Sequence, residues 1–304
     1  MTRPGAWRRR GAGLALATAL ALTAACGATP SSKSADVAKE ADKAQFNQAL
    51  HDLLPAAVLK RGTLTVGTDA SYAPMSSFGP DGRTIIGMEP DLGAAIGRVL
   101  GVRVRFTNQD FMQLLPDVVD GRIDLAMSAM TDTAQRARTV DFVNYFSAGT
   151  AIVVQRGNPE AITDIKDLCG RQVAVEAGTT QVDLLARAQT NCPGEPITVR
   201  TYPTNSDALV QLRTGRAAAV LNDLPPAVFL VNDPRTRSHY QLASTTQYEP
   251  GLYGIVVAPD QRGLRDAVQG ACEQLLRSGA YADVLERWKV AGGAVDRVSI
   301  DSDR

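Results

Sequence analysis

The sequence predicts an α/β protein built from two similar lobes. Strand-like and helix-like segments alternate between residues 62 and 128, and the alternation returns between 173 and 223, as is typical of sheets covered by helices. In each stretch a helix stops at a Gly-Arg pair, Gly121-Arg122 or Gly215-Arg216, and the following strand ends in polar residues. We therefore expect two related lobes that face each other.

The first stretch carries the patterns of four strands and two helices. Alternating or continuous apolar residues predict strands at 64–69, 85–87, 102–106 and 123–127. Apolar residues at helical spacing predict helices at 91–100 and 111–120, the first capped by Asp91 and each ended by a glycine. A short helix is also expected within residues 45–59.

The second stretch repeats the alternation, and a connecting segment precedes and follows it. Its predicted strands lie at 173–176 and 217–221, and its predicted helices begin at Thr179 and Ser206. Extended segments at 146–155 and 253–257 are expected to connect the lobes, and two helices within 263–290 close the chain.

These elements suggest how the chain is divided. If the last helices pack on the first lobe, that lobe is discontinuous, and two crossing strands join it to the second lobe. We then expect lobe 1 at 45–148 plus 254–304, and lobe 2 with its connectors at 149–253.

The N-terminus has the features of an export signal. Four arginines precede an apolar run, Leu14 to Leu22, and small residues lead to Cys26. The run is shorter than the ~20 residues of a membrane-spanning helix. The Cys26 context resembles a bacterial lipobox, although Thr23 stands where Leu is more usual. The resemblance implies a signal peptide at 1–25, a lipid on Cys26, and a tether at 26–44 outside the cytoplasmic membrane. Plain secretion and either the general or the twin-arginine route remain alternatives.

Charge and composition exclude some classes of function. The 304 residues include 32 Lys plus Arg and 32 Asp plus Glu, and removal of residues 1–25 leaves a formal charge of −4. There is no basic stripe or aromatic platform that would indicate nucleic-acid binding. No later segment is long and apolar enough to predict a membrane helix.

The remaining cysteines suggest one disulfide. Cys169 and Cys192 both lie in loop-like contexts, and an extracytoplasmic location permits their pairing. Cys272 falls on the apolar face of a predicted helix, so we expect a buried thiol there.

Polar groups follow the strand ends, where ligands gather in α/β sheets. Asp69 and Tyr72 come just after one strand, and Ser128 and Thr131 come just after another. Arg136 follows with a planar fork of donors suited to a carboxylate; a surface ion pair is its plainer interpretation. In the second stretch, Thr179 is a natural N-cap, and the free amides of that helix start would suit an anion.

Several ordered motifs between residues 60 and 290 resemble a known family. They lie at 67–74 (GTDASYAP), 87–92 (GMEPDL), 110–116, 121–124 (GRID), 131–142, 178–181 (GTTQ) and 215–223. Together they resemble the bacterial extracellular solute-binding proteins of family 3, which serve amino-acid ABC importers. The resemblance implies a two-lobed periplasmic-binding-protein type II fold, in which each lobe is a mixed sheet flanked by helices and two crossing strands join the lobes.

The resemblance also implies roles for residues that hold an amino acid's charged groups. Arg136 would grip the α-carboxylate with help from the Thr131 hydroxyl. The helix start at Thr179 and Thr180 would support the same carboxylate from the other lobe. Asp223 would take the α-ammonium. The plainer interpretation of Arg136 and Asp223 is an interlobe salt bridge.

Further matched positions would complete the site. Ser128 and Ala129 would help to hold the ammonium through strand-end carbonyls or hydroxyls. Tyr72 and Phe111 would stack on the ligand's side chain, unless they are core aromatics, and Asp69 lies where the side-chain head would reach.

Two places depart from the commonest family pattern. Glu89-Pro90 replaces an Asp and an aliphatic residue, and Ala129 stands where a Ser is frequent, so a hydroxyl contact is lost there.

We therefore expect a monomeric lipoprotein on the outer face of the cytoplasmic membrane. It would capture a small amino acid, polar or basic because of Asp69, and deliver it to an ABC permease by lobe closure. No reaction, cofactor or metal is expected. One alternative is a dehydratase-like enzyme on the same scaffold, with Asp69 or Glu176 as its base. Another is a sensor-type ligand-binding domain.

Overall fold

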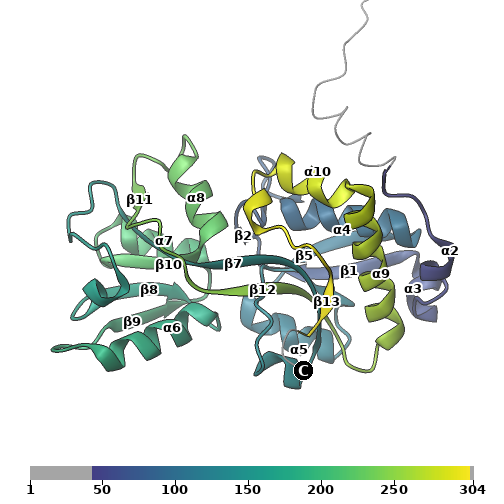
Figure 1. The fold of residues 1–304 in the computed structure, drawn as a ribbon, viewed down its shortest axis with the longest axis horizontal. Helices are drawn as coiled ribbons and strands as arrows, with labels where there is room; N and C mark the ends of the chain where they lie inside the picture. Colours follow the sequence, from purple (N-terminus) through teal and green to yellow (C-terminus); the bar gives the residue numbers. More distant parts are fainter. Residues whose placement is uncertain (1–42, 302–304) are drawn as a thin grey trace, which may run out of the picture.

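The computed structural model describes residues 43–301. The predicted signal peptide, Cys26 and all but the last two residues of the tether lie outside this range. The described chain forms two α/β lobes joined by two strands, as predicted (Figure 1). No helix within this range has the length and apolar character required to cross a membrane. We keep the predicted bounds, 45–148 plus 254–304 and 149–253, as the working definition of lobes 1 and 2.

Lobe 1 is organised around parallel strands. Its strands in the main sheet are β1 (Thr63–Thr68), β5 (Arg103–Asn108) and β6 (Leu125–Ala126). β1 lies between β5 and β6 and pairs in parallel with both. A separate small sheet contains β2 (Ser71–Tyr72), β3 (Ser76–Phe78) and β4 (Ile85–Ile86). The ends of β1 and β6 therefore lie next to each other, as the strand-end argument requires.

Lobe 2 repeats this arrangement with different strands. It contains β8 (Gln172–Glu176), β9 (Thr198–Tyr202), β10 (Ala219–Asp223) and β11 (Tyr240–Leu242). β8 pairs in parallel with β9 and with β10. The ends of β8 and β10, which carry Glu176 and Asp223, are consequently neighbours.

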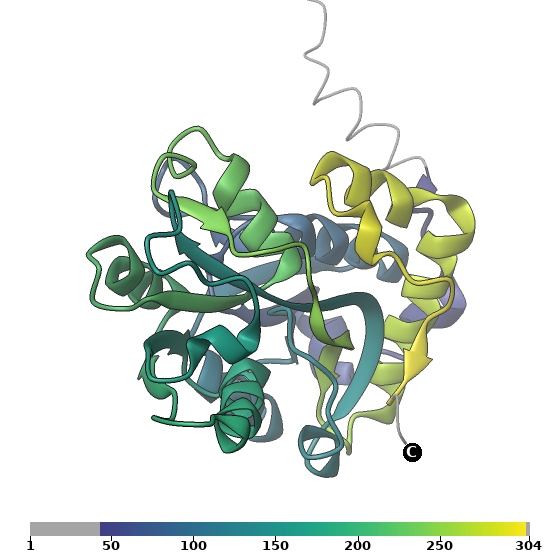
Figure 2. The ribbon, with the colours of Figure 1, turned by 60° about the vertical axis from the view of Figure 1, so that its left-hand side comes forward.

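Two long strands cross between the lobes. They are β7 (Asp141–Gln155) and β12 (Tyr248–Val257), and they pair with each other in antiparallel fashion. The full order of the main sheet is β5-β1-β6-β12-β7-β10-β8-β9, and β11 and β13 (Ser299–Ile300) also pair with β7. Figure 2 shows β7 as one curved ribbon that passes from lobe to lobe. The crossing strands make each lobe's sheet mixed.

Helices flank both sheets. In lobe 1 they are α2 (Gln48–His51), α3 (Ala56–Arg61), α4 (Met88–Leu100), α5 (Leu114–Val119), α9 (Arg262–Ser278) and α10 (Ala280–Arg287). In lobe 2 they are α6 (Thr180–Ala188), α7 (Asn205–Arg213) and α8 (Leu224–Asn232). Short 3-10 turns are η1 (Phe111–Gln113), η2 (Arg136–Arg138), η3 (Ile165–Leu168), η4 (Gln189–Asn191) and η5 (Ala291–Gly293). α9 and α10 both pack against α4, so the end of the chain lies with its beginning.

The start of α4 differs from the prediction. The helix begins at Met88, and its N-cap is Gly87 rather than Asp91. A Cβ atom at Gly87 would collide with the carbonyl of Met75, so the close approach of two chain segments requires glycine and sets the helix start. Asp91 instead accepts hydrogen bonds from Arg287 and Trp288, at 2.9 and 2.7 Å, and so ties α10 to α4.

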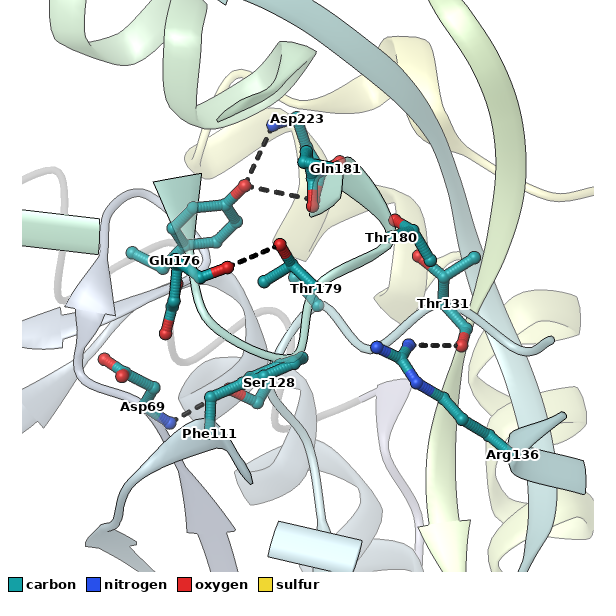
Figure 3. Close-up of a pocket in the computed structure, with 12 residues that line it drawn as sticks. Asp69, Phe111, Ser128, Thr131, Arg136, Glu176, Thr179, Thr180, Gln181 and Asp223 are labelled. Atoms are coloured by element: carbon teal, nitrogen blue, oxygen red, sulfur yellow. Dashed lines mark hydrogen bonds between the residues drawn. The ribbon is translucent and has the colours of Figure 1, made fainter. Parts of the chain in front are cut away.

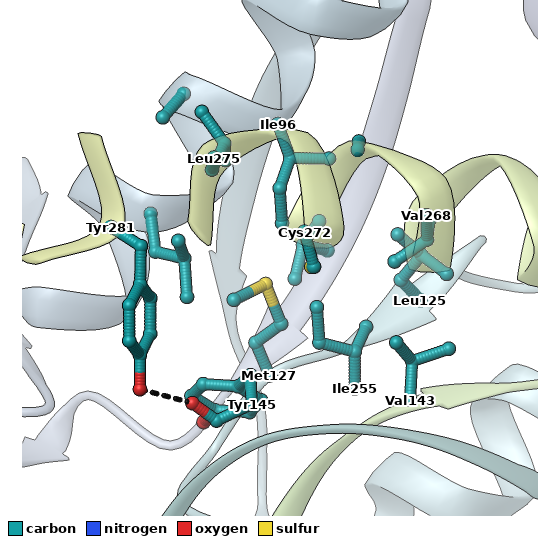
Figure 4. Close-up of a cluster of buried hydrophobic side chains, with 14 of the residues drawn as sticks. Ile96, Leu125, Met127, Val143, Tyr145, Ile255, Val268, Cys272, Leu275 and Tyr281 are labelled. Atoms are coloured by element: carbon teal, nitrogen blue, oxygen red, sulfur yellow. Dashed lines mark hydrogen bonds between the residues drawn. The ribbon is translucent and has the colours of Figure 1, made fainter. Parts of the chain in front are cut away.

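The predicted roles of Cys169, Cys192 and Cys272 are confirmed. Cys169 and Cys192 form a disulfide that joins the residue after η3 to the residue after η4 in lobe 2. Cys272 of α9 is a buried thiol in the core of lobe 1, among Met127, Tyr145 and other apolar side chains (Figure 4). Burial raises the pKa of Cys272 to about 12, so the thiol stays protonated and unreactive.

Candidate functional site

All ten predicted ligand-binding residues line one pocket between the lobes. The pocket contains about 340 Å³ of empty space, part of it open to solvent. Lobe 1 contributes Asp69, Tyr72, Phe111, Ser128, Ala129, Thr131 and Arg136. Lobe 2 contributes Thr179, Thr180 and Asp223, together with Glu176 and Gln181, which were not among the predicted ligand-binding residues. Most of these residues lie at or just after strand ends or at the start of α6, whereas Phe111 and Arg136 begin η1 and η2 (Figure 3).

Arg136 supplies positive charge to the pocket. Its Nη1 donates to the carbonyl oxygen of Thr131 at 2.7 Å, and its Nη2 donates across the cleft to the carbonyl oxygen of Gly178 at 2.9 Å. The guanidinium carbon lies 5.6 Å from the centre of the Phe111 ring. Burial lowers the pKa of Arg136 to about 10, so the group is still charged at neutral pH. Its hydrogen-bond partners within residues 43–301 are neutral, which leaves the charge suited to an anionic ligand.

Asp223 supplies negative charge from the other lobe. It is the last residue of β10 and the N-cap of α8. Its Oδ1 accepts from Nε2 of Gln181 at 2.7 Å, and its Oδ2 accepts from the hydroxyl of Tyr72 at 3.1 Å. Burial raises the pKa of Asp223 to about 6, and hydrogen bonds from tyrosine and glutamine limit the rise. The carboxylate is therefore mainly ionised at neutral pH.

Backbone groups hold the strand ends of lobe 1 in place. The amide of Asp69 donates to Oγ of Ser128 at 2.9 Å, which links the end of β1 to the end of β6. Ala129 has a left-handed backbone, with φ of 46°. Its amide donates to the carboxylate of Glu89 at 2.6 Å, and the same buried group accepts from Ser76 and Tyr145. Glu89, seen in the sequence only as a departure from the family pattern, thus positions the pocket wall.

The start of α6 lies at the pocket, and Thr179 is its N-cap residue as predicted. Its side chain, however, makes no capping bond to the helix; Oγ1 donates instead to the carbonyl oxygen of Glu176 at 2.8 Å. Amides in the first turn of a helix that are not capped by a side chain favour an anion. Together with Arg136, this helix start forms the electropositive side of the pocket.

Glu176 and Gln181 are pocket residues missing from the predicted set. Glu176 ends β8 and is 7% exposed, and Figure 3 shows its side chain pointing toward Asp69. Burial first, and then the nearby carboxylate of Asp69, raise the pKa of Glu176 to about 10. Two signals were available in the sequence. Glu176 ends a predicted strand, just as Asp69 does, and Gln181 closes the motif that begins at Gly178.

Comparison with known proteins assigns the family. The model of the bacterial extracellular solute-binding proteins, family 3, matches residues 64–291. The chain belongs to this family. The match spans both lobes and includes every residue that lines the pocket.

Relatives of this solute-binding protein are named for the amino acids they bind. The arginine-binding protein ArgT of Corynebacterium glutamicum is 29% identical over 253 residues, which are 82% of this chain and 81% of the relative. The L-cystine-binding protein TcyJ of Escherichia coli is 29% identical, over 76% of this chain and 84% of the relative. The solved structure of an ancestral arginine-binding protein bound to glutamine is 32% identical, with a TM-score of 0.70, and the match covers 76% of this chain and 99% of that chain.

These relatives are solute-binding proteins and not enzymes, in agreement with the expectation that this chain catalyses no reaction. Within residues 43–301, no group of three or more His, Cys, Asp or Glu side chains is placed to hold a metal ion. The carboxyl groups that line the pocket are instead spread over both lobes, at Asp69, Glu176 and Asp223.

Proposed function

We propose that this solute-binding protein captures a free amino acid, with a polar or basic side chain, in the pocket between its lobes. One observation carries the proposal. A half-buried guanidinium, Arg136, and a buried carboxylate, Asp223, line the same pocket from opposite lobes; the two charges attract each other, but the described structure contains no hydrogen bond or salt bridge between them. The pocket thus presents opposite charges that make no direct contact with each other.

An amino acid carries the two complementary charges. Its α-carboxylate would accept hydrogen bonds from Arg136 and from the amides at the start of α6. Its α-ammonium would lie against Asp223. Neither protein charge is stable when it is desolvated alone, so a ligand that neutralises both favours the closed cleft. Closure on the ligand would prepare the protein for delivery to an ABC permease.

The rest of the pocket would receive the ligand's side chain. Tyr72 and Phe111 offer aromatic surfaces, and Asp69 offers a carboxylate beyond them. A carboxylate favours a side chain that donates hydrogen bonds over an acidic one. The names of the relatives, which include arginine and cystine, are consistent with this range of ligands.

We further propose that a lipid on Cys26 holds the protein at the outer face of the cytoplasmic membrane, with residues 26–44 as the tether. The Arg-rich start, the short apolar run and the small residues before Cys26 support this proposal. Growth of the producing cells with an alkyne fatty acid should label the wild type. A Cys26→Ala variant should be unlabelled and released, whereas equal labelling of both would contradict lipidation at this residue.

A thermal-shift screen of the common amino acids and their analogues tests the proposed ligand class. A ligand that binds only the folded protein stabilises it by an amount that grows with its concentration over its dissociation constant. We expect stabilisation by one or a few polar or basic amino acids and none by acidic ones. Absence of any response to free amino acids at millimolar concentration would contradict the proposal.

A further inference from the structure

A second pair of carboxyl groups faces across the cleft, apart from the Arg136 and Asp223 anchors. Asp69 follows β1 in lobe 1, and Glu176 ends β8 in lobe 2. Both are buried, at 4% and 7% exposure, and the Glu176 side chain points toward Asp69 (Figure 3). Oε1 of Glu176 is shielded from solvent, and no group in the described part of the chain donates a well-formed hydrogen bond to it, although the Asp69 carboxyl lies close enough to raise the pKa of Glu176. A buried carboxyl oxygen without a partner indicates that something outside the protein completes this place.

The groups around Glu176 do not neutralise it. Asp69 faces it from the end of β1, Asp110 from the start of η1 and Asp223 from the end of β10, and the phenol of Tyr72 is also close. Arg136 is the single basic side chain among the residues that line the pocket. Its hydrogen bonds go to Thr131 and Gly178.

Two charged carboxylates that face each other from opposite lobes would oppose closure of the cleft. Two carboxylates in one desolvated site repel each other, so one of them must retain a proton. Burial first, and then Asp69, accordingly raise the pKa of Glu176 to about 10. A cation placed between the two groups would remove the need for that proton.

We propose that Glu176 is a specificity-determining residue that, with Asp69, forms a two-carboxylate cage for a cationic side chain, with one wall on each lobe. The inference rests on the proposed function, because the cage would hold the far end of the same amino acid. A guanidinium or ammonium group would enter the cage, and the proton that Glu176 retains without it would leave to water. The ligand's positive charge takes the place of the proton. A neutral side chain cannot replace the proton in this way: either Glu176 keeps its proton, or the carboxylates of Asp69 and Glu176 face each other without a cation between them.

L-arginine and L-citrulline form a matched pair of probes for this cage. They have the same length and the same α-carboxylate and α-ammonium groups, but the head of citrulline is a neutral ureido group. Their affinity ratio therefore cancels the contributions of Arg136 and Asp223. Because a charge-assisted hydrogen bond is about twice as strong as a neutral one, we expect the wild type to bind arginine about tenfold more tightly or better in calorimetric titrations.

Glu176→Gln should bring this ratio close to one, mainly through weaker arginine binding, and citrulline binding should persist. Asp69→Asn should also reduce the ratio, which keeps the test valid if one variant fails to fold in a melting experiment. Glu195→Gln is the matched control, because it makes the same chemical change at an exposed position of lobe 2 and should leave the ratio unchanged.

The pH dependence of the ratio separates a direct charge role from a structural one. Arginine favours the ionised form of Glu176, whose pKa is raised without it, so the preference for arginine should grow between pH 5 and 8 in the wild type and stay flat in Glu176→Gln. A wild type that binds citrulline as tightly as arginine would overturn the cage while the proposed function survives. A wild type that binds no amino acid in the screen would instead overturn the proposed function.

Discussion

The hydroxyl of Tyr72 and Asp223 are joined across the cleft by two hydrogen bonds. The hydroxyl donates to Oδ2 of Asp223 at 3.1 Å and accepts from the backbone amide of Asp223 at 2.8 Å. On the other side of the pocket, Arg136 of lobe 1 donates to the Gly178 carbonyl of lobe 2. The groups assigned to the two charges of the ligand therefore also join the lobes, which explains how binding and closure can be one event.

Replacing Tyr72 by Phe should weaken amino-acid binding. The change removes one donor to Asp223 and leaves the Asp223 amide without its acceptor in a buried place. We expect a loss of about five- to tenfold in affinity by calorimetry. Tyr240→Phe is the control, because that hydroxyl bonds to Leu209 in lobe 2, away from the pocket. An equal effect of both changes would argue against a role for the cross-cleft bonds.

Replacing Arg136 by Ala should cost roughly 2–5 kcal/mol of binding free energy, because it leaves a buried ligand carboxylate unpaired. Arg136→Lys should restore only part of this loss, since the planar fork is absent. Arg122→Ala serves as the control: that arginine is exposed and bonds to Asp117 and Asp120. A dissociation constant unchanged by Arg136→Ala would remove this residue from the site.

Amino-acid binding should weaken in acid. Burial raises the pKa of Asp223 to about 6. An ammonium group beside it favours the ionised form and lowers the pKa in the complex. The affinity for the amino acid is then highest above about pH 6. It falls as the pH drops through that value, by up to about tenfold for each pH unit. Titrations from pH 5 to 8 should show this fall, and Asp223→Asn should bind weakly without it. An equally strong affinity of the wild type at pH 5 would contradict the assignment.

Removing the disulfide should destabilise lobe 2 without changing which ligand the pocket prefers. The bridge closes a loop with a sequence separation of 23 residues. In the chain-entropy model, a loop of this size corresponds to about 3 kcal/mol. Urea unfolding of a Cys169→Ala, Cys192→Ala double variant should show a loss of this order, while the arginine to citrulline ratio is unchanged. Mass mapping of the exported protein should find the two cysteines linked, and free thiols at both would refute the bridge.

Much of the fold and the predicted pocket follows from local pattern. The alternation of strands and helices predicts both sheets. The ends of parallel strands bring Asp69 and Ser128 together in lobe 1, and Glu176 and Asp223 together in lobe 2, because parallel strands end at a common edge. The resemblance to family 3 contributes the roles of Arg136 and Thr179. These residues lie together in the structure, and their contacts with a ligand stay predictions.

Other features depend on contacts between distant segments. Glu176 and Asp69 lie in different lobes, so no local sequence pattern predicts that they line the same pocket. Glu89 supports Ala129 from 40 residues away. Gly87 replaces Asp91 as the cap of α4 because the chain passes close to Met75, which helical periodicity does not reveal.

The most direct test of the central claim compares L-arginine with agmatine, which keeps the guanidinium but lacks the α-carboxylate. If Arg136 and the start of α6 hold the carboxylate, calorimetric titration should show one site for arginine and binding of agmatine weaker by about thirtyfold or more. Equal affinity for the two compounds would contradict the account, because the pocket would then recognise a cation and not an amino acid.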